Sequence, residues 1–361
     1  MKPENLKIKS LQGDYTVEFS NTLVELTNAI KTIPNPICLI DKNIKQIYQI
    51  ELQSALGTIA CFEIDPTEEM KTLQGIMQVS NWLQSQNTNK QSTLVAIGGG
   101  ITQDIAAFSA HIYYRGIKWV FIPTTLLSMG DSCIGAKCGI NLNSFKNQVG
   151  VFHAPSKVLI CSEFINTLKD IDVESGYGEM LRLMLTEKDD DIRYFEGLLE
   201  NKGLRNNELP NLIRRSLEVK KNVIEVDEHE KDLRRILNYG HSFGHALEAL
   251  TNHEISHGNA VAWGVDLINF ISVRRNLVSQ NEYEKIHKMI KKYFSFKIKT
   301  KFNARELIQA TKRDKKVDGS AINLILFAGA GKLKIIKTEF DQVLEDQISE
   351  YLETQNVFYW N

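Results

Sequence analysis

The chain has 361 residues, a length at which two domains are expected, and it carries 43 basic and 44 acidic side chains. A formal net charge of −1 excludes a nucleic-acid or membrane partner held by bulk electrostatics. Five widely spaced cysteines without a CxxC pair argue against a disulfide framework, and neither a signal-like N-terminus nor a run of about 18 apolar residues occurs. We therefore expect a soluble, cytoplasmic protein with reduced thiols.

The first half of the chain alternates short apolar runs with amphipathic stretches. The runs, in chain order, are PICLID (36–41), TIACFEI (58–64), LVAIGGG (94–100), WVFIPTT (119–125) and VLICSE (158–163). Alternation of this kind predicts βαβ units and a largely parallel sheet. The continuous apolarity of residues 93–97 is typical of a strand that helices cover on both faces.

A glycine-rich turn joins one of these runs to a helical pattern. Gly98, Gly99 and Gly100 follow LVAI and precede ITQDIAAFSAHIYY. Glycines there would let the backbone approach a pyrophosphate at a helix N-terminus, and a purely geometric tight turn is the alternative. At the end of an earlier run, Asp41 either accepts hydrogen bonds from ribose hydroxyls or caps the next helix.

Basic and polar residues occur along the glycine-rich segment DSCIGAKCGINLNSFKNQVGVFHAP (131–155). Lys137, Lys146 and Asn147 lie in it, and lysines in a glycine-rich loop suit a phosphate-bearing ligand because each ammonium gives a charge-assisted hydrogen bond. A solvated loop is the alternative. Lys315 and Lys316 form a second basic pair, to which an exposed charge run is the alternative.

From about residue 170 onward the pattern becomes helical. Helical periodicity occurs in DIRYFEGLLENK, LPNLIRRSLEVKKNVIEV and QNEYEKIHKMIKKYF, with few strand signals between them. The sequence therefore predicts an α/β nucleotide-binding domain with a largely parallel sheet over residues 1–168. An all-α domain is expected over residues 169–361.

Three histidines mark a candidate metal site in this second domain. His241 and His245 are four residues apart, so they share one helix face, and His257 follows twelve residues later. Catalytic zinc sites usually have three protein ligands and one open position. His245 is either the third ligand or a group that faces the substrate, and Glu179, at the start of an amphipathic pattern, is a carboxylate that could complete the set.

Several blocks in register resemble one known family. GGGITQD, YYRG, PTTLLSMGDSCIGAKCGIN, KNQVGVF, VDEHEKDLRRILNYGHSFGHALE and HGNAVAWG occur in this order. With them the chain resembles the 3-dehydroquinate synthase family of sugar phosphate cyclases from about Asp41 to Lys316. The resemblance implies an N-terminal α/β domain that binds NAD and a C-terminal helical domain that holds a divalent metal, zinc or alternatively cobalt. It also implies an active site in the cleft between the two domains.

The resemblance assigns roles residue by residue. It implies that Glu179, His241 and His257 bind the metal and that His245 faces the phosphate. The other matching substrate and phosphate positions are Asp131, Lys137, Asn147, Lys220, Arg234, Asn238 and Lys315, with Arg115 reaching in from the second subunit of a homodimer. The positions that match the family's NAD contacts are Asp41, Asn43, Glu68, Lys71, Gly99, Gly100, Asp104, Thr124, Thr125 and Lys146.

The implied activity is that of a carbon–oxygen lyase in the shikimate pathway of aromatic amino acid biosynthesis. It converts 3-deoxy-arabino-heptulosonate 7-phosphate to 3-dehydroquinate and phosphate by transient oxidation, phosphate elimination, reduction and an intramolecular aldol reaction. Lys220 and Arg234 favour such an acidic substrate, because a carboxylate needs cationic partners.

The chain departs from the family pattern at several positions. Arg182, a candidate catalytic residue, stands where the family has lysine near the substrate. A guanidinium is larger, planar and unable to act as a base, so the hydroxyl pattern of the substrate ring is expected to differ. Gln103 and Ala136 replace glycines, and Cys138 replaces a threonine. These departures leave open a paralogous cyclase that acts on a different sugar phosphate in secondary-metabolite or polysaccharide biosynthesis. Two other classes are a metal-dependent polyol dehydrogenase, which would release NADH, and a nucleotide-binding homologue without turnover.

Overall fold

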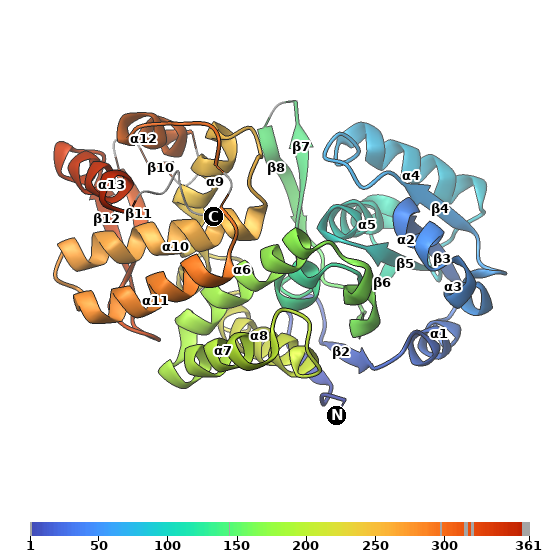
Figure 1. Cartoon of the computed structure of the whole chain (residues 1–361). Coiled ribbons are helices and arrows are strands. Elements are labelled where there is room, and N and C mark those ends of the chain that lie inside the picture. Colours follow the sequence, from blue (N-terminus) through green and yellow to red (C-terminus); the bar gives the residue numbers. More distant parts are fainter. Residues whose placement is uncertain (1, 144, 297, 314–316, 319–320, 356–361) are drawn as a thin grey trace. The chain divides into compact units, whose positions relative to one another are not determined.

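A computed structural model describes residues 2–143, 145–296, 298–313, 317–318 and 321–355. The chain forms two compact units, each built from two segments (Figure 1). We call the first the sheet unit, Met1–Leu168 with Asn207–His229, and the second the helical unit, Lys169–Asn206 with Glu230–Asn361. Within the described ranges, no helix is long and apolar enough to span a bilayer.

The sheet unit is organised around a seven-stranded sheet of order β1-β2-β9-β6-β5-β3-β4. β1 is antiparallel to β2, and every other neighbouring pair is parallel, which confirms the prediction of a largely parallel sheet. The strands are β1 (Leu6–Ile8), β2 (Tyr15–Ser20), β3 (Pro36–Asp41), β4 (Cys61–Ile64), β5 (Thr93–Gly98), β6 (Lys118–Pro123) and β9 (Lys157–Cys161). The five apolar runs correspond to β3, β4, β5, β6 and β9, whereas β1 and β2 were not predicted.

Helices connect and cover these strands. All six residues of β5 are buried, as a central strand covered on both faces requires. The helical elements are α1 (Leu23–Lys31), α2 (Lys42–Ile47), α3 (Gln49–Leu56), α4 (Leu73–Ser85), α5 (Gly100–Ile112), η1 (Tyr113–Arg115), η2 (Ser128–Ser132), η3 (Ser162–Thr167) and α8 (Leu209–Ile224). α5 begins within the glycine turn that follows β5, as the sequence predicts.

The glycine-rich segment expected to be a lysine-bearing loop is a β-hairpin instead. β7 (Lys137–Leu142) pairs antiparallel with β8 (Phe145–Phe152), and the register shifts between Ile140 and Leu142. Lys137 pairs with Phe152 at the base of the hairpin, while Lys146 and Asn147 lie near its tip. The backbone N–H groups therefore pair across the hairpin, and the lysines do not form one continuous phosphate-binding loop.

The second chain segment of the sheet unit is centred on α8. Sequence periodicity places residues 207–229 in the second domain, whereas in the structure they pack with the sheet unit. The hydroxyl of Ser216 on α8 donates to the carbonyl of Gly130 at 2.8 Å, a buried hydrogen bond that attaches α8 to η2. Helical periodicity identifies the apolar face of α8 but not the partner that covers it.

The helical unit is mainly helical, as predicted, and also contains a three-stranded antiparallel sheet. Its helices are α6 (Asp170–Glu187), α7 (Asp189–Lys202), η4 (Leu233–Asn238), α9 (His241–Leu250), α10 (His257–Arg274), α11 (Gln280–Tyr293), α12 (Ala304–Lys312) and α13 (Gln342–Thr354). Its strands are β10 (Val317–Asp318), β11 (Ala321–Phe327) and β12 (Leu333–Glu339). The expectation of an all-α domain missed this sheet, because a short, nearly continuous apolar run such as AINLILF does not distinguish a strand from a buried helix.

Candidate functional site

Two glycines bring α6 and α10 into close contact at the candidate metal site of the helical unit. A Cβ on Gly258 would lie 1.7 Å from the carbonyl oxygen of Ser175, and one on Gly178 would lie 2.0 Å from the carbonyl oxygen of Gly258. Gly178 precedes Glu179, and Gly258 follows His257. The close backbone approach therefore places these two side chains next to each other. Neither glycine was identified from the sequence.

A second glycine contact positions α9 against α10. Gly240 has a φ of 79° and immediately precedes α9, whose first residue is His241. A Cβ on Gly264 of α10 would lie 2.0 Å from the carbonyl oxygen of Gly240. Glycine favours this left-handed turn, and the close packing leaves no space for a Cβ at either position. The start of α9, and with it His241, is held against α10.

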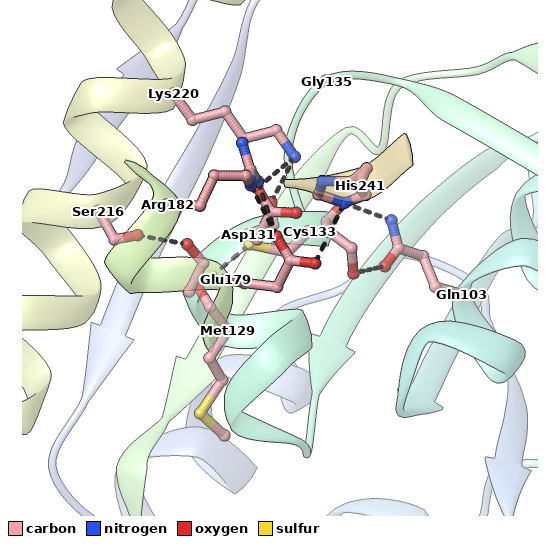
Figure 2. Close-up of polar contacts among 12 residues, drawn as sticks. Gln103, Met129, Asp131, Cys133, Gly135, Glu179, Arg182, Ser216, Lys220 and His241 are labelled. Atoms are coloured by element: carbon pink, nitrogen blue, oxygen red, sulfur yellow. Dashed lines mark hydrogen bonds and ion pairs between the residues drawn. The ribbon is translucent and has the colours of Figure 1, made fainter. Parts of the chain in front are cut away.

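The resulting side-chain geometry matches a metal site. Glu179 Oε1 lies 3.3 Å from His241 Nε2 and 3.0 Å from His257 Nε2. Zinc–ligand bonds of about 2.0 Å in a tetrahedron separate neighbouring donor atoms by about 3.3 Å, so each of these two separations suits a pair of donor atoms on one ion. Glu179 is 2% exposed and His257 is 34% exposed, so one side of the cluster is accessible. Figure 2 shows Glu179 and His241.

His245 belongs to the same cluster. The nearest ring nitrogens of His241, His245 and His257 lie within 4.8 Å of one another, and this trio is the only group of three or more potential metal ligands of this tightness in the described part of the chain. The His245 ring centroid lies 5.4 Å from that of His241 and 5.6 Å from that of His257. His245 can therefore act beside the metal or on it. The assignment of Glu179, His241 and His257 as ligands stays a prediction, supported by the shorter distances of Glu179.

Glu248 contributes to the different pKa values of two neighbouring imidazoles. Burial lowers the pKa of His241 to about 4, although Glu179 opposes this shift. Burial also disfavours the charged form of His257, but its hydrogen bonds to Glu179 and Glu248 outweigh burial and raise its pKa to about 10. Burial opposes ionisation of Glu179 as well, yet the positive charge of Arg182 and the two histidines hold its pKa well below the usual range.

Glu248 also orients the ring of His257. His257 Nδ1 lies 3.0 Å from Glu248 Oε2, which leaves Nε2 directed at Glu179. Carboxylates that hold the second nitrogen of a metal-binding histidine fix its tautomer and ring orientation. The sequence contains a signal for this residue that was missed: Glu248 follows His241 by seven residues and His245 by three, on the same face of α9.

A buried ion pair occupies the candidate substrate region of the sheet unit. Lys220 Nζ on α8 lies 3.0 Å from Asp131 Oδ1 on η2, and the same ammonium donates to the Asp131 backbone carbonyl at 2.8 Å (Figure 2). Lys220 is buried, and the Asp131 side chain is largely buried. The structure thus brings together two residues that are far apart in the sequence and that the sequence assigns to substrate binding.

Three of the residues expected to contact NAD also gather in the sheet unit. Lys71 Nζ forms a buried ion pair with Asp104 at 2.7 Å, and Asp104 accepts a hydrogen bond from the Gly139 N–H at 3.1 Å. Glu68 accepts from the Asn141 side chain at 2.7 Å. Charged and polar contacts therefore join three parts of the sheet unit: α5, β7 and the segment that precedes α4.

Asp41 caps a helix, one of the two roles left open by its sequence position. Its carboxylate accepts the backbone N–H of Asn43 at 2.8 Å at the start of α2. Burial raises the pKa of Asp41, and this hydrogen bond opposes the shift. A contact between Asp41 and a ribose stays a prediction.

The glycine turn lies where two central strands end. Thr124 after β6 donates its N–H to the Gly98 carbonyl at 2.9 Å. A Cβ on Gly99 would lie 3.0 Å from the Thr125 methyl group, whereas one on Gly100 would meet no atom within 4 Å. The backbone at the start of α5 is therefore open to a ligand at Gly100.

Comparison with known proteins identifies the family. The 3-dehydroquinate synthase N-terminal model matches residues 61–175, and the C-terminal model matches residues 176–317. A 3-dehydroquinate synthase from Pelagibacter ubique is 33% identical over 359 residues, covering 93% of this chain and 95% of the relative. One from Dictyoglomus turgidum is 36% identical over 272 residues, covering 75% of this chain and 76% of the relative.

The chain belongs to the 3-dehydroquinate synthase family.

The fold of this synthase-family chain is similar to those of several solved structures. A 2-deoxy-scyllo-inosose synthase, complexed with carbaglucose-6-phosphate, NAD⁺ and Co²⁺, is 23% identical with a TM-score of 0.84 and covers 96% of this chain and 100% of its own. A 2-epi-5-epi-valiolone synthase from Streptomyces hygroscopicus, with NAD⁺ and Zn²⁺ bound, is 23% identical with a TM-score of 0.81 and covers 95% and 98%. A glycerol dehydrogenase from Schizosaccharomyces pombe, at 14% identity and a TM-score of 0.60, covers 94% and 91% and shares the fold more distantly.

The remaining predicted site residues of this synthase-family chain differ in their exposure. Arg115 is exposed with a φ of 62°, and Lys137, Lys146 and Asn147 are exposed on the hairpin. Arg234 on η4 is 4% exposed. The Asn238 side chain donates to Glu230 at 2.5 Å. Lys315 and Lys316 lie outside the described residues.

One departure from the family pattern has a structural role. The Gln103 side chain on α5 donates to the Ser132 carbonyl at 2.6 Å, and the Ser132 hydroxyl donates back to Gln103 Oε1 at 2.6 Å. This reciprocal pair joins α5 to η2, the element that carries Asp131. A glycine at position 103 could not make it.

Gly258→Ala tests the glycine contact next to the candidate metal site. The added methyl group forces α6 and α10 apart, so we expect a loss of about 1–3 kcal/mol in the free energy of unfolding and a lower zinc content per chain. Thermal unfolding and elemental analysis measure the two effects. Gly197→Ala on α7 is the matched control, because its Cβ would meet no atom within 4 Å. If both substitutions changed the free energy of unfolding and the zinc content equally, the close approach of α6 and α10 would not be what positions the site.

Proposed function

We propose that this protein is an NAD- and metal-dependent 3-dehydroquinate synthase. It converts 3-deoxy-arabino-heptulosonate 7-phosphate to 3-dehydroquinate and phosphate, as a carbon–oxygen lyase of the shikimate pathway in the cytoplasm. The observation that carries the proposal is the convergence of Glu179, His241 and His257 at the distances of a metal site, within a chain that aligns with 3-dehydroquinate synthases over most of its length.

The proposed ligand atoms support a divalent metal, and the structures of related proteins support NAD⁺ as the second cofactor. One carboxylate oxygen and two imidazole nitrogens are ligands that zinc accepts, with a position left for substrate. Structures of two related cyclases were obtained with NAD⁺ and with Co²⁺ or Zn²⁺. When bound, the metal would polarise substrate oxygens, and the nicotinamide would accept a hydride and return it.

The substrate's carboxylate end and ring are assigned to charged side chains. Arg234 offers a guanidinium fork that matches a carboxylate, and Asn238 adds an amide donor. The Lys220 ammonium contacts both the carboxylate and the backbone carbonyl of Asp131. These two contacts fix the orientation of the pair before substrate binds. Such a preorganised pair can hydrogen-bond ring hydroxyls without reorganising during the reaction. His245 lies in the candidate metal cluster and is the residue that we assign to proton transfer there.

The phosphate is assigned to the cations of the hairpin and to a second subunit. Lys137 and Asn147 would bind its oxygens together with His245 and Lys315, while Lys146 would contact NAD. Arg115 is exposed at the end of η1, where it can reach a neighbouring copy, so we propose a homodimer in which each subunit completes the other's phosphate site.

The decisive assay monitors phosphate and dehydroquinate together. The zinc-loaded protein is incubated with NAD⁺ and heptulosonate 7-phosphate, and we expect equal amounts of phosphate and 3-dehydroquinate without net NADH. Omitting NAD⁺ from stripped protein should abolish phosphate release. Accumulation of NADH would indicate a dehydrogenase, and absence of phosphate release from protein that holds both zinc and NAD⁺ would exclude this substrate.

A further inference from the structure

Arg182 binds the carboxylate of Glu179 from the side opposite the histidines. It lies one turn further along α6, and both side chains are 2% exposed. Arg182 Nε donates to Glu179 Oε2 at 2.9 Å, and Nη2 lies 2.8 Å from the same oxygen (Figure 2). The other oxygen, Oε1, faces Nε2 of His241 and of His257. The two carboxylate oxygens therefore have different partners.

Because Arg182 occupies Oε2, only Oε1 of Glu179 faces the histidines and is directed at the proposed metal position. A carboxylate can bind zinc or cobalt through one oxygen or through both, and a second oxygen would fill the position that a catalytic site keeps open. Two N–H groups of a planar guanidinium hold Oε2 in a fixed direction, whereas the single ammonium of lysine is a compact point charge on a flexible stem. The ion pair also offsets the negative charge of Glu179, so less of the metal's positive charge is neutralised.

We infer that Arg182 is a positioning residue that restricts Glu179 to one-oxygen metal binding and so preserves the coordination position for substrate. The inference rests on the proposed function, because it presumes a metal at Glu179, His241 and His257. A side chain that is 2% exposed and hydrogen-bonded to Glu179 can act on the metal through that residue.

Cobalt substitution provides a direct readout of coordination. The full-length protein with saturating NAD⁺ is stripped of metal and titrated with Co²⁺, and the visible absorption spectrum is recorded for the wild type, Arg182→Gln and Arg182→Lys. We expect the wild type to bind one Co²⁺ with the intense absorption of four-coordinate cobalt. In Arg182→Gln, release of Oε2 raises the coordination number, so the band should lose intensity and shift to shorter wavelength.

Arg182→Lys distinguishes the effect of the guanidinium geometry from the effect of the positive charge. If the guanidinium fork is what matters, the lysine variant shifts in the same direction as Arg182→Gln even though it retains the positive charge. This variant also keeps the test open if Arg182→Gln does not fold. Arg193→Gln is the matched control: Arg193 on α7 pairs with Asp189 at the surface, so its loss should leave the spectrum unchanged.

The outcomes distinguish this inference from the proposed function. A wild-type protein that binds Co²⁺ stoichiometrically, with a spectrum identical to those of both Arg182 variants, would overturn the positioning role and leave the metal site intact. A wild-type protein that binds no Co²⁺ would overturn the metal site and this inference with it.

Discussion

Glu179→Ala is expected to abolish stoichiometric zinc binding and to slow phosphate release from heptulosonate 7-phosphate by about 10³-fold or more. The oxygen that contacts both His241 Nε2 and His257 Nε2 is removed, and a bound metal ion contributes several kcal/mol of transition-state stabilisation. Elemental analysis after gel filtration measures the metal, and a phosphate assay measures the rate.

The same substitution also leaves Arg182 buried without its carboxylate. Removing one member of a buried ion pair costs about 3–5 kcal/mol, so the folded state of Glu179→Ala must be verified by circular dichroism. Glu179→Gln, which keeps the shape of the side chain, serves if the alanine variant does not fold. Asp172→Ala is the control, because Asp172 is an exposed acidic residue on the same helix. Wild-type zinc content in folded Glu179→Ala and Glu179→Gln would remove Glu179 from the site.

Lys220→Met is expected to reduce kcat/KM by about 10²-fold or more while leaving zinc content unchanged. The substitution preserves most of the side-chain length but removes the ammonium that binds Asp131 Oδ1 and the Asp131 carbonyl. It therefore removes both the proposed substrate contact and the group that positions Asp131. Steady-state kinetics and metal analysis give the two readouts.

Lys221→Met is the matched control for this prediction. Lys221 is the next residue on α8 and forms a partly exposed ion pair with Glu225 at 3.2 Å, an interaction worth about 0–1 kcal/mol. The double variant Lys220→Met/Asp131→Asn tests the coupling: if the two residues act as a unit, its rate should resemble that of the single variants rather than their combined loss. Equal activity of Lys220→Met and Lys221→Met would contradict the assignment.

The βαβ half of the fold follows from local pattern. Apolar runs such as residues 93–97 can be buried only between two layers of helix, and the glycine turn after β5 begins α5. The β7–β8 hairpin and the three-stranded sheet escaped prediction for different reasons. Glycines and lysines in the hairpin obscured its strand pattern, and β11 is a short, nearly continuous apolar run that suits either a strand or a buried helix.

The sequence by itself determined which residue types were available for a metal and a phosphorylated acid, and the i, i+4 spacing that puts His241 and His245 on one helix face. Only the tertiary structure brought carboxylates into contact with them and added Glu248 to Glu179. Glu179 is brought to the histidines by the contact at Gly178 and Gly258, and the role of Arg182 depends on which oxygen of Glu179 it binds. The physical reason is that periodicity reports the neighbours within one helix. The pairing of distant segments depends instead on how closely their backbones approach and on which buried charges must be paired.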